Sequence, residues 1–111
     1  MAESPSHRRY KNKDAGTTGQ TEVVLPTGQR LDALSPTGIA TEIERSGAQG
    51  IKKSVATLKA ALDQGIARKA RLRVPQPDMA AAYKEMRRQR LGGDLTNLTG
   101  TEKRHVPKRR R

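Results

Sequence analysis

The chain has 111 residues, which leaves room for one small domain and excludes a multidomain enzyme. Only 32% of its residues are apolar, and it has no Phe, Trp or Cys, so we expect a small aliphatic core without disulfides or thiolate metal sites. The formal net charge of +12 favours a polyanionic partner, and nucleic acid is the first candidate.

The most polar parts of the chain are its two ends. Residues 1–20 are rich in Ser, Gly, Thr and charge and show no apolar period. Residues 101–111 carry six basic side chains against one acidic, and they end in a run of lysine and arginine. We expect both segments to be disordered basic tails on either side of a single domain over 21–100. The C-terminal run is either a solvated tail or an arm that grips phosphate.

Two Pro-Thr-Gly tripeptides separate three short apolar segments, and they predict an antiparallel meander over 23–43. Proline presets φ at the first loop position, and glycine accepts the positive φ that a three-residue hairpin loop needs at its last position. The residues that flank each loop should therefore pair, with Leu25 opposite Gln29 and Ser35 opposite Ile39.

Apolar residues at helical spacing from Ile51 to Leu62 predict a helix over about 47–64. Ser46 and Gln49 have the spacing of a capping box at its start, and Gln49 is either this cap or a contact to substrate. The expected helix connects the meander to the next extended segment.

A fourth strand is predicted over 66–74, where apolar and basic residues alternate. Asp78 can cap a second helix that ends at the Gly92-Gly93 pair, and a short strand is predicted over 95–99. The fold class is therefore α+β, with a small mixed sheet of a three-strand meander, a crossover helix and a fourth strand, flanked by two helices.

The chain shows no feature of a membrane protein. No apolar run approaches the roughly 18 residues of a membrane span. The first 14 residues also lack the apolar stretch of a signal peptide. We expect no membrane partner, and the absence of cysteine favours the cytoplasm.

Counting along the predicted meander places Asp32 opposite both Glu22 and Glu42. Like charges directly opposite in an antiparallel pair are destabilising, because their Cβ atoms lie roughly 4.5–5.5 Å apart. A hard divalent cation, Mg²⁺ or Mn²⁺, is the simplest compensation, so Asp32, Glu42 and Glu22 are the predicted metal ligands. Leu31 and Ile43 would then point to the buried face of the sheet, and the acids to its open face.

The alternative is a row of exposed acids that neighbouring lysines and arginines neutralise, as Arg30 would neutralise Glu44. The metal site also depends on the predicted register. A change of one residue in either loop would move Asp32 to the other face of the sheet and abolish the site.

The segment over 21–76, with RLDALSPTGIATEIERSGAQGIKKSVATLKAALDQGIARKARLRVP at its centre, resembles the core of the PD-(D/E)XK nuclease superfamily. It is most similar to the small nuclease domains at the C-termini of bacterial polymorphic and contact-dependent toxins. That core has a β-meander, a helix and a further strand, with Asp on one strand and Glu-x-Lys on the next. By this resemblance Asp32 is the metal-binding Asp, and Glu42 is the first residue of Glu-x-Lys.

The resemblance implies metal-dependent hydrolysis of phosphodiester bonds in DNA or RNA, with Mg²⁺ or Mn²⁺ held by Asp32 and Glu42. Glu44 stands at the position of the family's lysine, as in some restriction enzymes of the superfamily, and it would ligate the metal or orient the attacking water. Lys52 or Lys53, on the following helix, would then stabilise the charge on the phosphate.

Basic side chains of the predicted fourth strand and second helix are the expected contacts to the nucleic-acid backbone. They are Lys69, Arg71, Arg73, Arg87, Arg88 and Arg90. The rival interpretation is a non-catalytic basic nucleic-acid-binding protein, which EDTA would leave bound to its ligand. A homodimer is compatible with the sequence. The toxin resemblance implies a cognate immunity protein as a further partner and delivery into a target cell.

Overall fold

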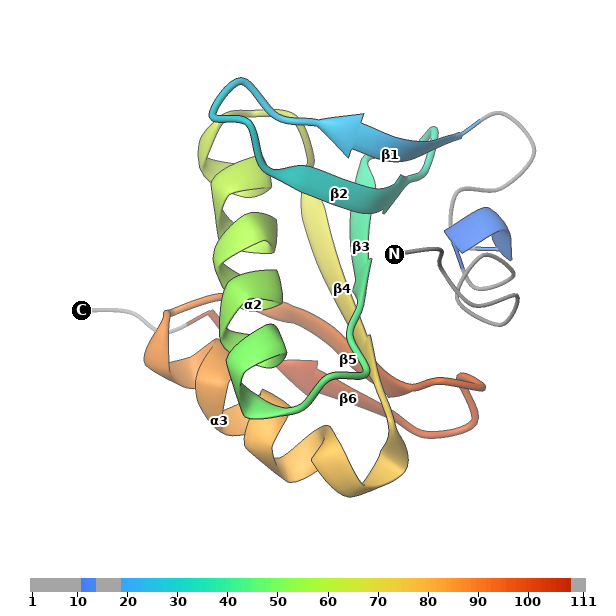
Figure 1. Cartoon of the computed structure of the whole chain (residues 1–111), viewed down its shortest axis with the longest axis vertical. Coiled ribbons are helices and arrows are strands. Elements are labelled where there is room, and N and C mark those ends of the chain that lie inside the picture. The colour runs from blue at the N-terminus through green and yellow to red at the C-terminus, as the bar shows by residue number, and fades with distance from the viewer. Residues whose placement is uncertain (1–10, 14–18, 109–111) are drawn as a thin grey trace.

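The computed structural model describes residues 11–13 and 19–108, which form a six-stranded mixed sheet with helices packed on it (Figure 1). The strands are β1 (Gln20–Val24), β2 (Arg30–Leu34), β3 (Ile39–Ile43), β4 (Lys69–Val74), β5 (Gly93–Asn97) and β6 (Lys103–Val106). The helices are α2 (Ala48–Asp63) and α3 (Met79–Arg88), and the 3-10 turn η1 (Gln76–Asp78) precedes α3. The predicted α+β class is confirmed.

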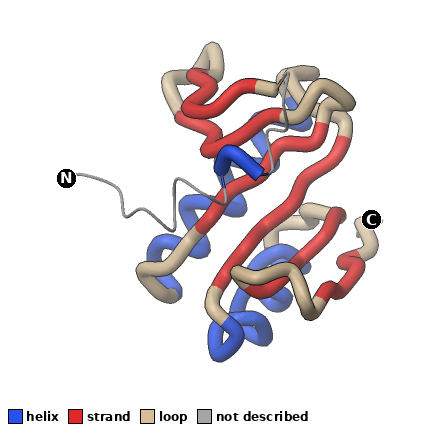
Figure 2. Tube along the Cα trace, turned by 90° about the vertical axis from the view of Figure 1, so that its right-hand side faces the viewer, coloured by secondary structure: helices blue, strands red, loops and turns tan. Residues whose placement is uncertain are grey.

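The strands lie in the sheet in chain order, from β1 to β6. β1, β2 and β3 are antiparallel neighbours, β3, β4 and β5 are parallel, and β6 is antiparallel to β5. The two parallel connections run through α2 and α3 and advance across the sheet in one direction. Because both crossover connections have the same handedness, both helices lie on the same face of the sheet, as Figure 2 shows. In the described part of the chain, no helix is long and apolar enough to cross a membrane.

The hydrophobic core lies between the sheet and the two helices and is aliphatic. Val55 and Leu58 of α2 and Met86 of α3 pack against Leu72 and Leu95 of the sheet, and all five side chains are fully buried. Burial of each such side chain contributes about 1.5–3 kcal/mol. The core therefore has the small size and the aliphatic character that the composition predicts.

Both Pro-Thr-Gly turns form the predicted three-residue loops. Leu25 N–H donates to the Gln29 carbonyl at 2.7 Å, and Ser35 N–H donates to the Ile39 carbonyl at 2.9 Å. The glycine that closes each loop has a positive φ, 92° in the first loop and 88° in the second, which glycine adopts without strain. The predicted pairing at both turns is confirmed.

The predicted helix caps are wrong. α2 begins at Ala48 after Gly47, and the Ser46 hydroxyl donates to the Glu44 carboxylate instead of capping the helix. Asp78 precedes α3 but makes no side-chain capping bond. Because Gly47 occupies the N-cap position of α2, Ser46 lies one residue too early in the chain to cap the helix.

The C-terminal segment differs most from the prediction. β6 lies within the expected disordered tail and pairs with β5, and its Val106 side chain is fully buried. The Arg104 guanidinium lies 4.4 Å from the centre of the Tyr83 ring on α3. One apolar residue among charged ones gives no strand period, so only tertiary packing reveals β6. The neighbouring strands also begin elsewhere than predicted, β4 at Lys69 and β5 at Gly93.

The predicted N-terminal tail lies mostly outside the described residues. The exception is a helical turn at 11–13, which Figure 2 shows in front of the sheet, on the face opposite to α2 and α3. Lys11 in this turn is only 3% exposed, and its Nζ lies 2.6 Å from Glu22 Oε1 of β1. This contact ties the turn to the edge strand.

Candidate active site

Asp32 on β2 and Glu42 on β3 meet across the antiparallel pair. Ala33 pairs with Thr41, and one position further the same register brings Asp32 opposite Glu42. At this position the carboxyl side chains accept hydrogen bonds from backbone N–H groups of the opposite strand, in place of the usual bonds between the two backbones. Ile43 N–H donates to Asp32 Oδ2 at 2.7 Å, and Asp32 N–H donates to Glu42 Oε2 at 2.8 Å. The backbone of each strand thus holds the carboxyl group of the other.

The Glu42 carboxyl group is buried, with 7% of the residue exposed. Burial raises the pKa of Glu42 well above its usual range, and the charge of Asp32 and a hydrogen bond between the two carboxyl groups raise it further. The hydrogen bond from Asp32 N–H opposes this shift, and the charge of Glu44 adds to it. Glu42 therefore keeps its proton to a higher pH than an ordinary glutamate.

Glu44, two residues further along the chain, is half-buried and in a different electrostatic state. Its carboxylate accepts hydrogen bonds from Ser46 N–H at 2.9 Å, from the Ser46 hydroxyl, and from Ser54 Oγ of α2 at 2.9 Å. Burial alone would raise the pKa of Glu44, but the bonds from Ser46, Ser54 and Arg45 N–H together lower it. The pKa values of Glu44 and Glu42 are thus shifted in opposite directions.

Gly50, in the first turns of α2, allows Glu44 to lie this close to the helix. A Cβ atom at residue 50 would overlap both Ser46 Oγ and the Glu44 carboxylate. The serines and the glycine were not expected as site residues. Their only signal in the sequence is spacing, since Gly50 and Ser54 lie four residues apart and so share one face of a helix.

Gly50→Ala is expected to lower the free energy of unfolding by roughly 1–3 kcal/mol, because the added methyl group overpacks the site. At an ordinary position inside a helix, replacing glycine with alanine instead raises the free energy of unfolding by about 0.5–1 kcal/mol. Urea unfolding measures the difference. Combining the change with Ser46→Ala removes one overlapping atom and should recover part of the loss, whereas a gain in stability from Gly50→Ala alone would contradict the close contact.

Asp32, Glu42 and Glu44 line one open pocket of about 410 Å³ at the carboxyl end of β3, together with Ile43, Arg45, Ser46 and Ser54. Arg45 is the only cation among the described residues of this lining. In residues 11–13 and 19–108, no group of three or more acidic, histidine or cysteine side chains is arranged to hold a metal ion. The pocket thus contains a carboxyl pair, with a third carboxylate turned toward serines.

The acids do not lie on the open face of the sheet, as predicted, but on the face that the helices cover. Glu42 pairs with Leu72 of β4, whose side chain belongs to the core. Residues side by side in neighbouring strands share a face, so Glu42 points toward α2. Ile43, the next residue, lies on the opposite face, where it is 3% exposed but outside the core cluster under the helices. The contact between Glu44 and Ser54 of α2 agrees with this orientation.

Glu22, the third predicted metal ligand, is not among the residues that line the pocket. Its φ of 56° interrupts β1, and its carboxylate forms the ion pair with Lys11. Beyond this point the β1–β2 hairpin bends over α2 (Figure 1), and at its tip Thr27 Oγ1 accepts a hydrogen bond from Gln64 at 3.1 Å. Leu31 of β2 is buried in the core, as predicted.

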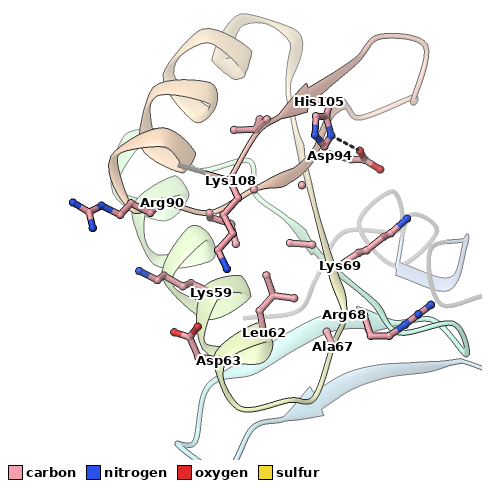
Figure 3. Close-up of a pocket in the computed structure, with 15 residues that line it drawn as sticks. Lys59, Leu62, Asp63, Ala67, Arg68, Lys69, Arg90, Asp94, His105 and Lys108 are labelled. Carbon is pink, nitrogen blue, oxygen red and sulfur yellow. Dashed lines mark ion pairs between the residues drawn. The ribbon is translucent and has the colours of Figure 1, made fainter. Parts of the chain in front are cut away.

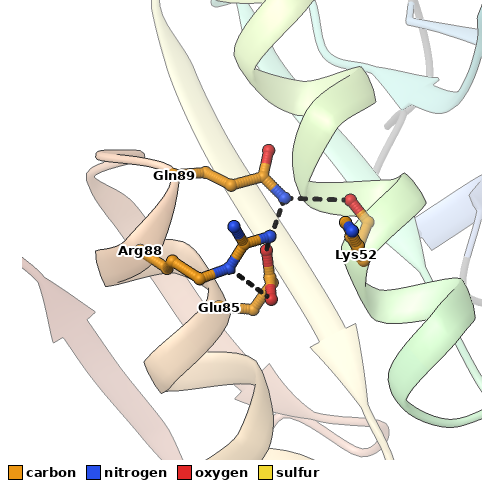
Figure 4. Close-up of polar contacts among 4 residues, drawn as sticks. All are labelled: Lys52, Glu85, Arg88 and Gln89. Carbon is orange, nitrogen blue, oxygen red and sulfur yellow. Dashed lines mark hydrogen bonds and ion pairs between the residues drawn. The ribbon is translucent and has the colours of Figure 1, made fainter.

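Lys52 and Lys53, expected to replace the family's lysine, are exposed on α2 and do not line the pocket. The Lys52 carbonyl accepts a hydrogen bond from Gln89 Nε2 at 3.1 Å, and Gln89 and Arg88 both donate to Glu85 (Figure 4). The hydrogen bonds from Arg88, together with the charges of Arg88 and Lys52, lower the pKa of Glu85 despite its slight burial. Lys52 therefore belongs to the contact between α2 and α3.

The predicted basic face of β4 is only partly exposed. Lys69 is exposed, but Arg73 is 4% exposed and donates through Nη1 to the Leu98 carbonyl at 3.1 Å. Arg71 is half-buried, and its Nη2 lies 4.0 Å from Asp94 Oδ2. The alternation of residues along the strand correctly predicted that these three side chains share one face of the sheet. The strands and loops that follow β4 bury part of that face.

The predicted phosphate-binding arginines of α3 and of the segment after it also lie in different environments. Arg88 is paired with Glu85 at 2.5 Å, Arg87 is half-buried, and Arg90 lies beyond the helix and lines a second pocket. Lys69 lines the same second pocket. The six predicted phosphate contacts therefore do not form one continuous surface.

No family model, no curated protein and no solved structure matches the chain. The functional interpretation therefore rests on the residues and on their geometry. Three features of that geometry bear on chemistry. Asp32 and Glu42 lie side by side with the pKa of Glu42 raised, the Glu44 carboxylate accepts hydrogen bonds from Ser46 and Ser54, and Arg45 lines the same pocket.

Proposed function

We propose that this chain is a metal-dependent nuclease that hydrolyses phosphodiester bonds of DNA or RNA. The observation that carries the proposal is the hydrogen-bonded carboxyl pair of Asp32 and Glu42, which lines one pocket with Glu44. Two carboxyl groups in such contact are unfavourable unless a proton or a cation lies between them. The order of a meander, α2 and the parallel strand β4 supports a PD-(D/E)XK-like nuclease.

The donor set of the pocket fits a hard divalent cation. Carboxylate oxygens are the ligands that Mg²⁺ and Mn²⁺ prefer, and Asp32 and Glu42 would hold the ion. When bound, the metal supplies a Lewis acid and a water with a lowered pKa. Metal ligands must be deprotonated, so Glu42 has to release its proton and metal affinity should rise with pH.

The remaining groups of the pocket have separate tasks in this proposal. Glu44, held by Ser46 and Ser54, orients the attacking water and accepts its proton. Arg45 stabilises the negative charge that develops on the phosphate, because a guanidinium matches phosphate oxygens in a paired geometry. Arg45 thus takes the role expected of Lys52 or Lys53, which lie outside the pocket lining.

The toxin resemblance extends the proposal to an effector domain that is delivered into a target cell. An immunity protein would then neutralise it in the cell that produces it. The net charge of +12 suits both an immunity protein with an acidic surface and the nucleic-acid substrate. A homodimer stays a prediction.

The direct test is incubation of the full chain with plasmid DNA, total RNA or tRNA, each with Mg²⁺, Mn²⁺ or EDTA. We expect cleavage of at least one substrate with metal and none with EDTA, because the carboxylates alone cannot activate water sufficiently. Gel electrophoresis measures the products. Binding that persists in EDTA, with no cleavage under any condition, would instead establish the non-catalytic nucleic-acid-binding protein.

A further inference from the structure

A second pocket, of about 570 Å³, lies at the opposite end of α2 from the carboxyl pair (Figure 3). The last turns of α2, the starts of β4 and β5 and the end of β6 form its walls. The segments from β5 and β6 are distant in the sequence from those of α2 and β4, and the pocket therefore exists only in the folded sheet. Its volume falls within the roughly 300–1,000 Å³ of small-ligand sites.

Positive charge surrounds this pocket. Five lysine and arginine side chains line it, against two carboxylates, Asp63 and Asp94. The five are Lys59, Arg68, Lys69, Arg90 and Lys108. Figure 3 shows Lys108 pointing into the middle, with Lys59 and Arg90 on one side and Arg68 and Lys69 on the other. The excess of cations creates a local positive potential that attracts anions.

The floor of the pocket is apolar, which strengthens this potential. Leu62 and Ala67 lie below the charged groups, and Ala70, Leu91 and Val106 complete the floor and are buried. Low-dielectric walls reduce the screening of nearby charges, so an anion in the pocket is attracted more strongly than at a flat surface.

The surroundings hold the backbone of Lys108 and the side chain of Arg68. A Cβ atom at Gly92 would lie 2.7 Å from Lys108 N, so glycine at this position is what lets the backbone of Lys108 pack against the start of β5. Arg68 donates from Nε and Nη2 to the Thr37 carbonyl at 3.1 and 2.9 Å. Cations ordered before binding lose less conformational entropy when the ligand arrives.

We propose that this second pocket binds phosphate groups, supplied either by a nucleic-acid backbone or by a free nucleotide. Lys108 reaches into the pocket and four further lysines and arginines surround it, so the pocket matches the negative charge of phosphate. The apolar floor suits the base of a nucleotide. The site is separate from the carboxyl pair and stands whether or not that pair is catalytic.

Inorganic pyrophosphate and a single-stranded DNA 12-mer without terminal phosphates serve as probes, with affinity measured by calorimetry on the full chain. The double change Lys59→Gln/Lys108→Gln should weaken binding on the order of tenfold, because each exposed charge contributes a few-fold. Lys84→Gln/Lys103→Gln removes the same charge from exposed positions outside the pocket and should change affinity less than about twofold.

The outcomes separate the two sources of phosphate. Competition between pyrophosphate and the 12-mer at the pocket supports a backbone phosphate, whereas pyrophosphate binding that the 12-mer does not displace supports a free nucleotide. Equal weakening by both double variants would show that net charge alone attracts the anion and would overturn the site. Binding of a polyglutamate peptide but of neither phosphate probe would overturn it in favour of an acidic protein partner.

Discussion

Replacing Asp32 with Asn, or Glu42 with Gln, is expected to lower nucleic-acid cleavage on the order of 100-fold or more, because each change removes a ligand of the proposed metal. The fold should persist, since an amide has nearly the shape of a carboxylate and relieves the repulsion of like charges. In Glu42→Gln the new amide can still accept Asp32 N–H and can donate to the Asp32 carboxylate. Initial cleavage rates with Mg²⁺, together with circular dichroism, measure both effects.

Asp78→Asn is the matched control for these variants. It makes the same chemical change at a residue that precedes α3, makes no capping bond and lies outside the pocket lining. It should cleave at the wild-type rate. Thermal unfolding gives a second readout, because Mg²⁺ that binds only the folded state raises the Tm of the wild type and not of Asp32→Asn. Undiminished cleavage in both pocket variants would exclude a metal site at this pair.

The meeting of Asp32 and Glu42 was predictable because it depends on local rules. Each Pro-Thr-Gly turn fixes a loop of three residues, and the period of two along the paired strands then determines which residues stand opposite. A hairpin needs no information from distant parts of the chain. The same reasoning correctly predicted α2, whose apolar spacing is regular, and the crossover to β4 that follows from it.

The face of the sheet on which the acids lie was not predictable from the meander. The choice depends on where α2 and α3 pack against the sheet. The positive φ of Glu22 within β1 likewise has no signal in the residue itself. Glutamate rarely adopts this conformation. Burial of Glu42, and with it the raised pKa, follows from the packing of α2 against β3 and is a tertiary property.

The second pocket is also a tertiary property. It depends on β6, which places Val106 beside β5 and is followed two residues later by Lys108. A run of charged residues with one valine predicts a tail and not a strand. Basic residues assigned to one surface by strand alternation were divided by the fold. Lys69 reached this pocket, whereas Arg73 was buried against the loop that contains Leu98.

Glu42→Gln is expected to stabilise the protein at neutral and alkaline pH and to have little effect in acid. Folding raises the pKa of Glu42, so the folded state binds a proton that the unfolded state has already lost. Wild-type stability should therefore fall as the pH rises from the ordinary glutamate pKa of about 4.3 through the raised value. Each pKa unit of the shift costs about 1.4 kcal/mol, and 1 kcal/mol corresponds to roughly 4–8 °C in Tm.

Glu44→Gln, in the same pocket, is expected to change the stability of the protein in the opposite direction. The hydrogen bonds from Ser46 and Ser54 lower the pKa of Glu44, so its charge stabilises the fold above the ordinary glutamate pKa and stops doing so as the pH falls. The variant should lose stability at pH 7 and approach the wild type in acid. Urea unfolding from pH 4 to pH 9 without divalent metal measures both profiles. Parallel profiles for the wild type and Glu42→Gln would mean that the pair holds no shared proton, and the electrostatic basis of the metal site would fail with it.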